Sequence, residues 1–518
     1  MANRASALFA RAGEQPDAPA ILFEGRTITF GELARSVAET AAGLARIGVG
    51  KGARVGLLIG NSPDFVIAQQ ALFALGAVMS PLNILYRAGE IGHVVRSCAL
   101  DYLIVQEALI AQLPARSDAG LGPLKSVIVI DDDQERGKGW KSLPAAIGRG
   151  EAVFDLAEVA EDDVVMLLNT SATTGKSKGV MLTAGNLAAN YDRTPGWLGL
   201  DGSDVILCAL PLYNTFGLNQ CINVMLTTGA PLVLLPRFDA QRCIEAIATH
   251  GCTFLPAVPT MLQKIVDHPA LKPGSLGSLR RIMTGGAPVP APLLKRVLIA
   301  SPHVTVLTGY GLTEGTALVT LTQVRLGADG EVERGKTIGR VLDGMQVRIE
   351  DPEGRVVGPG AVGEIVVRGP NVMRGYFNAP DDTAAALVGG WLHTGDLGCV
   401  SVDGYAYIVD RKKDVIIRGG QNIYPAEIEE ILYQMPGVAE AAVVAGWDDV
   451  LGEVPVAFVA LQPSAKLSAP EMIERCRSEL AYYKVPVSVH IERELPKGPT
   501  GKILRRALKS TLPMCSAA

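Results

Sequence analysis

Residues 164–179 have the sequence VVMLLNTSATTGKSKG. Five apolar residues come first, and hydroxyl side chains, two lysines and two glycines follow them. This order predicts a buried strand that leads into a phosphate-binding loop, because backbone N–H groups and hydroxyls hydrogen-bond to phosphate and ammonium groups neutralise its charge. The candidate phosphate ligands are Thr170, Ser171, Ala172, Thr173, Thr174, Gly175 and Lys178.

Two other interpretations of this stretch have to be weighed. A Walker A loop shares Gly175-Lys176-Ser177, but it needs a glycine where Thr170 stands and a helix start after Ser177. A polar surface loop is the plainer alternative, and the stretch alone does not exclude it. The segments on either side have to decide.

The flanking sequence alternates helical and strand patterns. An amphipathic helix is predicted to start at Thr29-Phe30-Gly31-Glu32, and a buried strand is predicted for Val55 to Ile59. Short apolar runs bounded by Gly or Pro recur at residues 204–210, 230–235, 252–257 and 281–284. This texture predicts an α/β fold with mostly parallel, helix-covered sheets.

The pattern changes after Gly339. Closely spaced strands with turn signals, at residues 346–350, 363–368 and 405–409, indicate a small antiparallel or barrel-like lobe. Beyond the basic junction at residues 410–414, the order is strand, helix, strand, strand, helix, strand, helix. This last part predicts a compact α+β unit that can move as one body.

Composition excludes several classes of protein. The 518 residues, 48% hydrophobic and 19% charged with a formal charge of −5, fit a multidomain globular protein without long charged blocks, so no nucleic-acid partner is expected. The eight cysteines form no Cys-x-x-Cys pair, and the six histidines have no zinc-site spacing. No apolar run reaches the roughly 20 residues of a membrane span. The first residues lack a signal-peptide pattern, so a cytoplasmic location is expected.

Two further segments suit the binding of a nucleotide. Tyr310-Gly311-Leu312-Thr313-Glu314 combines an aromatic face, a hydroxyl for a phosphate and a carboxylate for a metal ion. Gly285-Gly286-Ala287-Pro288 follows a predicted strand and lets a flat ring lie against the backbone. Taken singly, each segment is also explained by packing or by an ordinary turn.

Charged residues near the C-terminal end complete the set. Asp396, at the end of a predicted turn, can accept hydrogen bonds from ribose hydroxyls, and Arg411 can assist it. Lys502 follows Pro499-Thr500-Gly501 and precedes a basic helix predicted for Ile503 to Lys509, which puts a mobile ammonium on a loop. An ordinary exposed lysine is the plainer alternative.

In this order and at these separations, the five motifs resemble those of the adenylate-forming superfamily, which comprises acyl-CoA synthetases, firefly luciferases and the adenylation domains of peptide synthetases. The resemblance extends from Thr29 to Lys502. It implies a large N-terminal adenylation domain (residues 1–412), a hinge at Lys413 and a small mobile lid (residues 413–518). It also implies ATP, Mg²⁺ and coenzyme A as cosubstrates and cofactor.

The resemblance assigns a role to each motif. The loop at residues 170–179 would hold the ATP phosphates, and the adenine would lie against Tyr310, Gly286 and Ala287. Lys502 would bridge the acid and the α-phosphate. The other assigned residues are Pro288, Gly309 and Gly311 at the nucleotide, Asp396 and Arg411 at the ribose, Glu314, Thr313 and Thr170 at the metal and α-phosphate, and Arg418, Gly419 and Gly420 at coenzyme A.

The acyl pocket is expected to be apolar. Its predicted residues are Tyr213, Asn214, Phe216, Val258, Met283, Gly285 and Leu312, on segments without Arg or Lys. A pocket without a second cation favours a hydrophobic monocarboxylic acid, with a fatty acid as the first candidate and an aryl acid of the coumarate or benzoate type as the alternative. A stand-alone adenylation enzyme that loads a carrier protein is a further alternative. The oligomeric state is left open, with a homodimer as one option.

Several positions differ from the usual superfamily pattern. Ala172 replaces a glycine and Ser177 a proline or similar residue, so a stiffer phosphate loop and slower turnover are expected. Asn214 stands where histidine is common, and a neutral amide cannot titrate. These differences leave a non-catalytic nucleotide-binding homologue as the last alternative.

Overall fold

The strand predicted before the phosphate loop is present. The computed structural model describes residues 2–114, 121–122, 124–131, 140–148, 154–170, 178–418, 420–448, 450–462, 465–498 and 502–512. Within them, β8 (Val164–Thr170) is largely buried, and β9 (Lys178–Thr183) pairs with it in antiparallel fashion. A strand, and not a helix, therefore follows residue 177, which argues against a Walker A arrangement. The predictions for Ser171, Ala172, Thr173, Thr174 and Gly175 lie outside the described residues.

The sheet around β8 has a parallel centre and an antiparallel edge. In spatial order its strands are β20 (Gly375–Tyr376), β9, β8, β4 (Val78–Pro81), β3 (Arg54–Leu58), β5 (Tyr102–Val105), β6 (Ser126–Val129) and β7 (Trp140–Ser142). The helix predicted at Thr29 is α2 (Phe30–Ile47), and Thr29 and Glu32 form a capping box at its start. Other helices in this half are α1 (Ser6–Glu14), α3 (Pro63–Ala74), α4 (Ala88–Ser97), η1 (Glu107–Gln112) and α5 (Leu143–Ile147).

A second sheet carries most of the predicted nucleotide and acyl segments. Its order is β16 (Val332–Glu333), β15 (Ala317–Leu326), β14 (Thr305–Leu312), β13 (Arg281–Thr284), β12 (Phe254–Ala257), β10 (Ile206–Cys208), β11 (Leu232–Leu234), β1 (Pro19–Phe23) and β2 (Arg26–Thr29), with β17 (Arg340–Val341) on β15. The neighbouring strands β14, β13, β12, β10, β11 and β1 run parallel to one another. The predicted helix-covered parallel sheet is thus confirmed, with antiparallel strands added at both edges.

Helices of the second half connect these strands. They are α6 (Ala184–Tyr191), α7 (Thr194–Leu198), α8 (Thr215–Gly217), the π-helical turn η3 (Leu218–Asn223), α9 (Val224–Thr228), α10 (Ala240–His250), α11 (Pro259–Val266), α12 (Ala291–Ala300) and the 3-10 turn η4 (Thr313–Gly315). In the described part of the chain, no helix combines the length and the apolar character needed to cross a bilayer.

The antiparallel lobe predicted after Gly339 is confirmed. Its strands run β18 (Gln346–Glu350), β19 (Gly363–Arg368), β22 (Trp391–Val400) and β21 (Leu387–Val388), with β23 (Ala406–Arg411) on β22. The prediction that Asp396 ends a turn is wrong, because residue 396 lies inside β22, where it pairs with Arg411 of β23. The ladder between these two strands holds the segment extended, and it also carries β23 two residues beyond the predicted end at residue 409.

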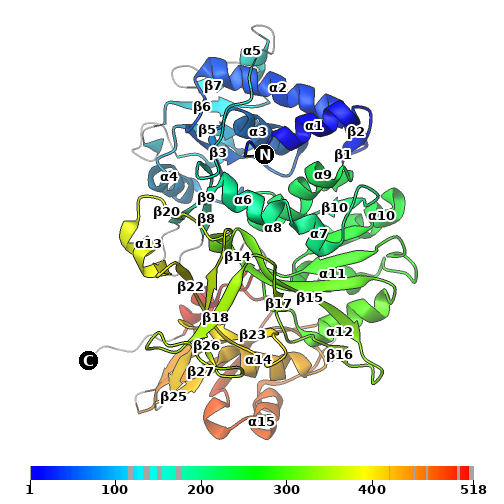
Figure 1. Cartoon of the computed structure of the whole chain (residues 1–518). Helices are drawn as coiled ribbons and strands as arrows, with labels where there is room; N and C mark the ends of the chain where they lie inside the picture. The colour runs from blue at the N-terminus through cyan, green and yellow to red at the C-terminus, as the bar shows by residue number, and fades with distance from the viewer. Residues whose placement is uncertain are drawn as a thin grey trace.

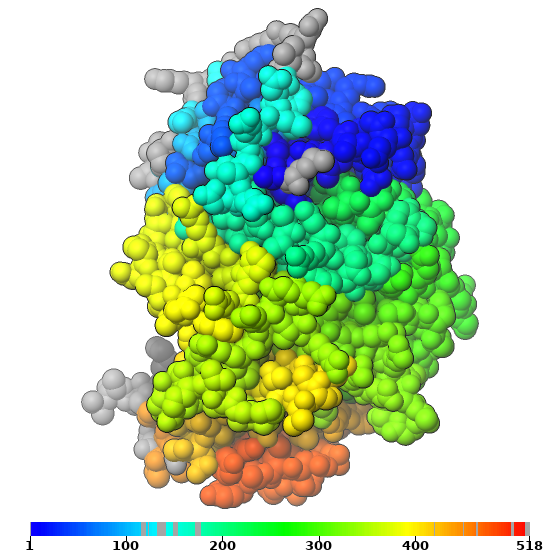
Figure 2. All heavy atoms as spheres, viewed as in Figure 1, coloured from blue at the N-terminus to red at the C-terminus, as the bar shows by residue number. Residues whose placement is uncertain are grey.

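A small C-terminal α+β domain, coloured orange to red, lies at the lower end of the larger body in Figures 1 and 2. Its sheet runs β25 (Gln421–Ile423), β24 (Ile416–Arg418), β27 (Gly452–Leu461) and β26 (Val438–Asp448), with β28 (Ser488–Glu492) on β27. Its helices are α14 (Pro425–Gln434), α15 (Ala469–Glu479), η5 (Tyr482–Lys484) and α16 (Arg505–Lys509). The basic helix starts two residues later than predicted, because Ile503 forms a β-bridge with Lys497.

Candidate active site

Asp396 lies at the meeting point of two sheets. Its carboxylate accepts a hydrogen bond from the Tyr310 hydroxyl of β14 at 2.7 Å and lies 3.1 Å from the Arg411 guanidinium of β23. Asp396 and Tyr310 are both buried. Burial, followed by the nearby Asp396 charge, raises the pKa of Tyr310, so the phenol stays protonated and donates. Three residues far apart in the sequence are thereby fixed in one place.

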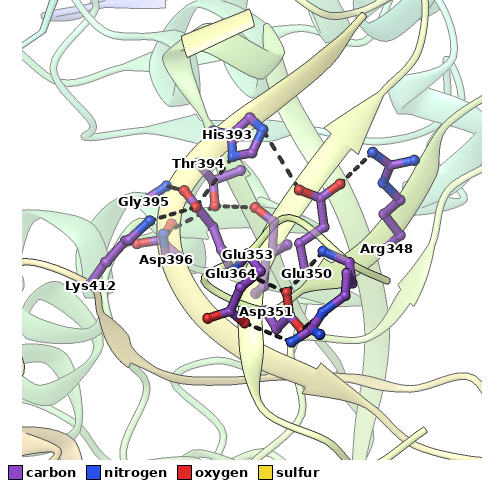
Figure 3. Close-up of polar contacts among 12 residues, drawn as sticks. Arg348, Glu350, Asp351, Glu353, Glu364, His393, Thr394, Gly395, Asp396 and Lys412 are labelled. Atoms are coloured by element: carbon purple, nitrogen blue, oxygen red, sulfur yellow. Dashed lines mark hydrogen bonds and ion pairs between the residues drawn. The ribbon is translucent and has the colours of Figure 1, made fainter. Parts of the chain in front are cut away.

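A second carboxylate, Glu364 of β19, binds the backbone of β22 at Gly395, the residue before Asp396. Glu364 accepts hydrogen bonds from the Gly395 N–H and from the Lys412 ammonium, both at 3.0 Å, and it lies 3.3 Å from the His393 ring (Figure 3). Burial alone would raise the pKa of Glu364, but these partners lower it overall. The sequence analysis missed this residue; its only signal is a carboxylate in a strand that is otherwise mostly apolar.

Glu314 and Lys178 are joined through Tyr376 of β20. The Tyr376 hydroxyl donates to a Glu314 carboxylate oxygen at 3.0 Å, and the Lys178 ammonium lies 5.2 Å from the centre of the Tyr376 ring. Thr313 and Glu314 form the short turn η4 directly after β14. The predicted metal ligand and the predicted phosphate ligand therefore flank one aromatic side chain, which the sequence analysis also missed.

Two of the predicted pocket residues, Phe216 and Val258, lie close to Gly286. A Cβ atom at Gly286 would lie 3.8 Å from Val258 and 4.0 Å from Phe216, and the backbone there has a φ of 78°. The Met283 methyl group approaches Gly309, where an added Cβ would lie 3.3 Å from it. The segments around residues 216, 258, 283 and 286 are thus brought together as predicted from the sequence, at the carboxyl ends of parallel strands, where open α/β sheets bind ligands.

Asn214 and Gly311 have local structural reasons for their identity. The Asn214 side chain accepts a hydrogen bond from the Gly217 N–H at 3.1 Å and so caps α8. A Cβ at Gly311 would lie 1.6 Å from the Ala317 carbonyl oxygen, so only glycine fits that position. Tyr213 and Leu312 are half-buried on the same segments, Gly285 is buried, and Ala287 and Pro288 follow on the loop after β13.

The C-terminal domain presents Lys502 to this site. Surrounding protein, followed by the Arg411 charge, lowers the pKa of Lys502 to about 8, while Asp396 acts in the opposite direction. Lys502 as a whole is nevertheless exposed to solvent. The Gly498 N–H donates to the Lys502 carbonyl at 2.7 Å, which fixes one end of its loop. Arg505, also missed from the sequence, anchors the other end through two 2.7 Å contacts with the buried carboxylate of Glu429.

The predicted coenzyme A residues are held elsewhere in the lid. The Arg418 guanidinium donates to the Tyr483 carbonyl at 2.8 Å, and Gly420 is exposed with a φ of 82°. Gly419 lies outside the described residues. Lys413 lies in a turn closed by a 2.9 Å hydrogen bond from the Asp414 N–H to the Arg411 carbonyl. In this orientation Lys502 is within electrostatic range of Asp396.

Similarity to known proteins establishes the family. Residues 8–377 match the AMP-binding enzyme family, and residues 427–502 match the AMP-binding enzyme C-terminal domain. The chain belongs to the AMP-binding enzymes. It is 34% identical to 4-coumarate–CoA ligase 2 of Oryza sativa subsp. japonica, over 98% of this chain and 92% of that one. It is 33% identical to the long-chain-fatty-acid–CoA ligase of Bacillus subtilis, over 95% and 91%.

The fold agrees with that of a solved AMP-binding enzyme. The structure of o-succinylbenzoate coenzyme A synthetase from Bacillus subtilis, in complex with ATP and a magnesium ion, matches with a TM-score of 0.83 at 31% identity and covers 97% of this chain and 99% of that one. Together with the named CoA ligases among its relatives, this shows that the AMP-binding enzyme described here is an acid–thiol ligase of the acyl- or aryl-CoA ligase type.

The residues of this AMP-binding enzyme fit a magnesium ion that is shared with a substrate. Among the described residues, no group of three or more His, Cys, Asp or Glu side chains could enclose a metal ion. Two carboxylates lie beside the segment that leads out of the predicted phosphate loop: Glu314, which is linked to it through Tyr376, and Asp382, which pairs with Lys178. Mg²⁺ is commonly bound by one or two carboxylates together with substrate phosphates and water, so this sparse set suits it.

Proposed function

We propose that the protein joins a hydrophobic monocarboxylic acid to coenzyme A through an acyl-adenylate, with release of AMP and pyrophosphate. The observation that carries the proposal is the cluster of Tyr310, Asp396 and Arg411, joined by contacts of 2.7 and 3.1 Å, whose charges act on the lid residue Lys502. Two anions, a carboxylate and a polyphosphate, have to meet in the first step, so convergent cations are what the barrier requires. A non-catalytic homologue would have no need of a lysine on the lid that faces these charges.

In the first half-reaction, a carboxylate oxygen of the acid attacks the α-phosphorus, and the bond to the pyrophosphate oxygen breaks. Lys502 would hold the acid and the α-phosphate together, and Lys178 would neutralise the other phosphates. Tyr310 would lie beside the adenine, with its hydroxyl already bonded to Asp396, and Asp396 with Arg411 would hold the ribose. Magnesium, held by Glu314, would supply charge neutralisation at the phosphates.

In the second half-reaction, the thiol sulfur of coenzyme A attacks the acyl carbonyl carbon, AMP leaves, and the thiol proton is released. Lys502 would occupy the region that the thiol has to reach, so the lid would rotate about Lys413 and bring Arg418 and Gly420 to the site. We place the boundary between the N-terminal domain and the lid at residues 412 and 413 on this basis. The 2.9 Å bond from the Ala426 N–H of the lid to the Asp410 carboxylate of the N-terminal domain crosses this boundary, so it would have to break or shift when the lid rotates.

The acid is proposed to be a fatty acid, with an aryl acid as the alternative. The pocket segments around Phe216, Val258 and Met283 carry no charged residue. This supports an apolar substrate without choosing between a chain and a ring. The named relatives include both kinds, the fatty-acid ligase of Bacillus subtilis and the coumarate ligase of rice.

A substrate panel tests this proposal. Purified enzyme with ATP, Mg²⁺ and free coenzyme A should form thioesters from octanoate, palmitate, benzoate or coumarate, and should leave malonate and succinate unreacted. Pyrophosphate release or exchange that depends on the acid, without any CoA thioester, would favour the carrier-protein alternative. The absence of acid-dependent pyrophosphate exchange over the whole panel would favour the non-catalytic homologue.

The pH dependence of adenylation should report Lys502. The pKa of Lys502 is lowered to about 8 in the free enzyme, and the role assigned to it needs the protonated form. The kcat/KM for acid-dependent pyrophosphate exchange should therefore fall as the pH rises through about 8, while kcat should fall at higher pH because bound phosphates favour the cation. A Lys502→Arg variant should lose this alkaline limb, since arginine stays charged. An unchanged limb in that variant would assign the titration to another group.

A further inference from the structure

Lys178 has a competing anionic partner within the protein. Its ammonium lies 2.5 Å from a carboxylate oxygen of Asp382, in α13 (Pro380–Ala386). The Lys178 side chain is 24% exposed and the Asp382 side chain 46%, so a ligand can reach both. The lysine predicted to meet the ATP phosphates thus carries a counter-ion when no nucleotide is present.

The fold holds Asp382 in this position through the neighbouring strand. β20 pairs with β9, with Tyr376 opposite Val180, and the Phe377 N–H donates to the Gly179 carbonyl at 2.8 Å. The chain then enters α13 beside this sheet edge (Figure 1), and the Thr383 hydroxyl accepts from the Tyr376 N–H at 2.9 Å. The helix that carries Asp382 is therefore bound to the same strand pair that carries Lys178.

The ion pair is also next to the predicted metal carboxylate. Tyr376 lies under the Lys178 ammonium and donates to Glu314, so Asp382 adds a second negative charge at the place where a polyphosphate with four negative charges, or somewhat fewer with magnesium, would bind. Such a charge opposes ATP in two ways, because it repels the phosphates and because its bond to Lys178 has to be given up.

We propose that Asp382 is a built-in counter-ion that holds Lys178 in the nucleotide-free enzyme and weakens the binding of ATP by competing with its phosphates for that ammonium. The inference rests on the proposed role of Lys178 in phosphate binding. It makes Asp382 a residue that sets nucleotide affinity without touching the acid, the ribose or the reacting atoms.

Equilibrium binding of ATP, measured by calorimetry without acid so that no adenylate forms, tests the inference. Asp382→Asn should lower the Kd for ATP by about two- to fivefold, since a partly exposed ion pair contributes modestly. The gain should appear both with Mg²⁺ and in EDTA, because it acts through Lys178. Asp381→Asn is the matched control, as it removes the same charge from the same exposed helical turn and should give a smaller change.

A double-mutant cycle makes the assignment specific. In a Lys178→Met background, Asp382→Asn should lose most of its gain, because the ammonium that it frees is absent. Asp382→Ala serves as a second variant, and melting temperatures verify that each variant is folded. Steady-state kinetics of the Asp382→Asn variant should show a lower KM for ATP with little change in kcat.

Three results would overturn the inference. Equal effects of Asp382→Asn and Asp381→Asn on the Kd for ATP would mean that only the net negative charge of this helix matters, and not the ion pair with Lys178. Weaker binding confined to the magnesium series would make Asp382 a metal ligand instead. Failure of the unmodified enzyme to bind ATP at all would remove the proposed function together with the inference, whereas the first two results leave that function intact.

Discussion

Replacement of Lys502 by alanine should reduce acyl-adenylate formation by about a hundred- to a thousandfold, which is the usual loss when one group that stabilises transition-state charge is removed. The lysine is a lid residue within electrostatic range of Arg411 and Asp396, and no chemistry in the thioester step requires it there. Preformed acyl-adenylate should therefore react with coenzyme A at close to the normal rate. Acid-dependent pyrophosphate exchange measures the first step, and single-turnover thioester formation from synthetic adenylate measures the second.

Lys509→Ala is the matched control for this experiment. Lys509 lies at the end of α16 and is largely exposed, 3.7 Å from Glu453 of the lid. Its loss removes the same charge seven residues downstream and should leave both half-reactions near normal. Equal loss of both half-reactions in Lys502→Ala would contradict the assigned role, as would a Lys509→Ala variant that is just as impaired in adenylation.

The sequence predicts those parts of the fold that short-range patterns control. The apolar run before Thr170 becomes β8, and Thr29 with Glu32 starts α2, because strand periodicity and helix capping act over a few residues. The strands at residues 346–350 and 363–368 also have the predicted bounds. Asp396 was misplaced at a turn because its extended conformation depends on pairing with Arg411, which lies fifteen positions further along the chain.

The missed site residues share this dependence on distant segments. Tyr376 is an ordinary aromatic residue until β20 pairs with β9 and places its hydroxyl on Glu314. Glu364 gains its function as a support only when Gly395 of β22 and Lys412, which follows β23, reach it. Arg505 is one of several basic residues in its helix, and only the fold places the buried carboxylate of Glu429 next to it. Local pattern carries no information on such pairings.

Replacement of Lys413 by proline should slow thioester formation by roughly tenfold or more while it changes adenylate formation much less, because proline fixes φ at a position that would have to rotate. Lys413 is the third residue of a turn that is closed by the hydrogen bond from the Asp414 N–H to the Arg411 carbonyl. The Arg411 side chain at the start of this turn is held by its ion pair with Asp396. A turn already disfavours proline there, so melting temperatures must be compared before the rates are interpreted.

Lys413→Ala separates the backbone effect from the charge effect. Burial, followed by the cations of Arg411 and Arg505, lowers the pKa of Lys413, while Asp414 acts in the opposite direction, so the ammonium is not strongly stabilised where it stands. The alanine variant keeps the backbone free to turn and should retain both half-reactions. If proline and alanine slowed thioester formation equally, the charge would be the important feature, and if neither did, the lid would have to pivot at another residue. Slower thioester formation in the proline variant alone would place the pivot at residue 413. A fixed φ at that residue would then keep the lid in the orientation in which Lys502 lies at the nucleotide.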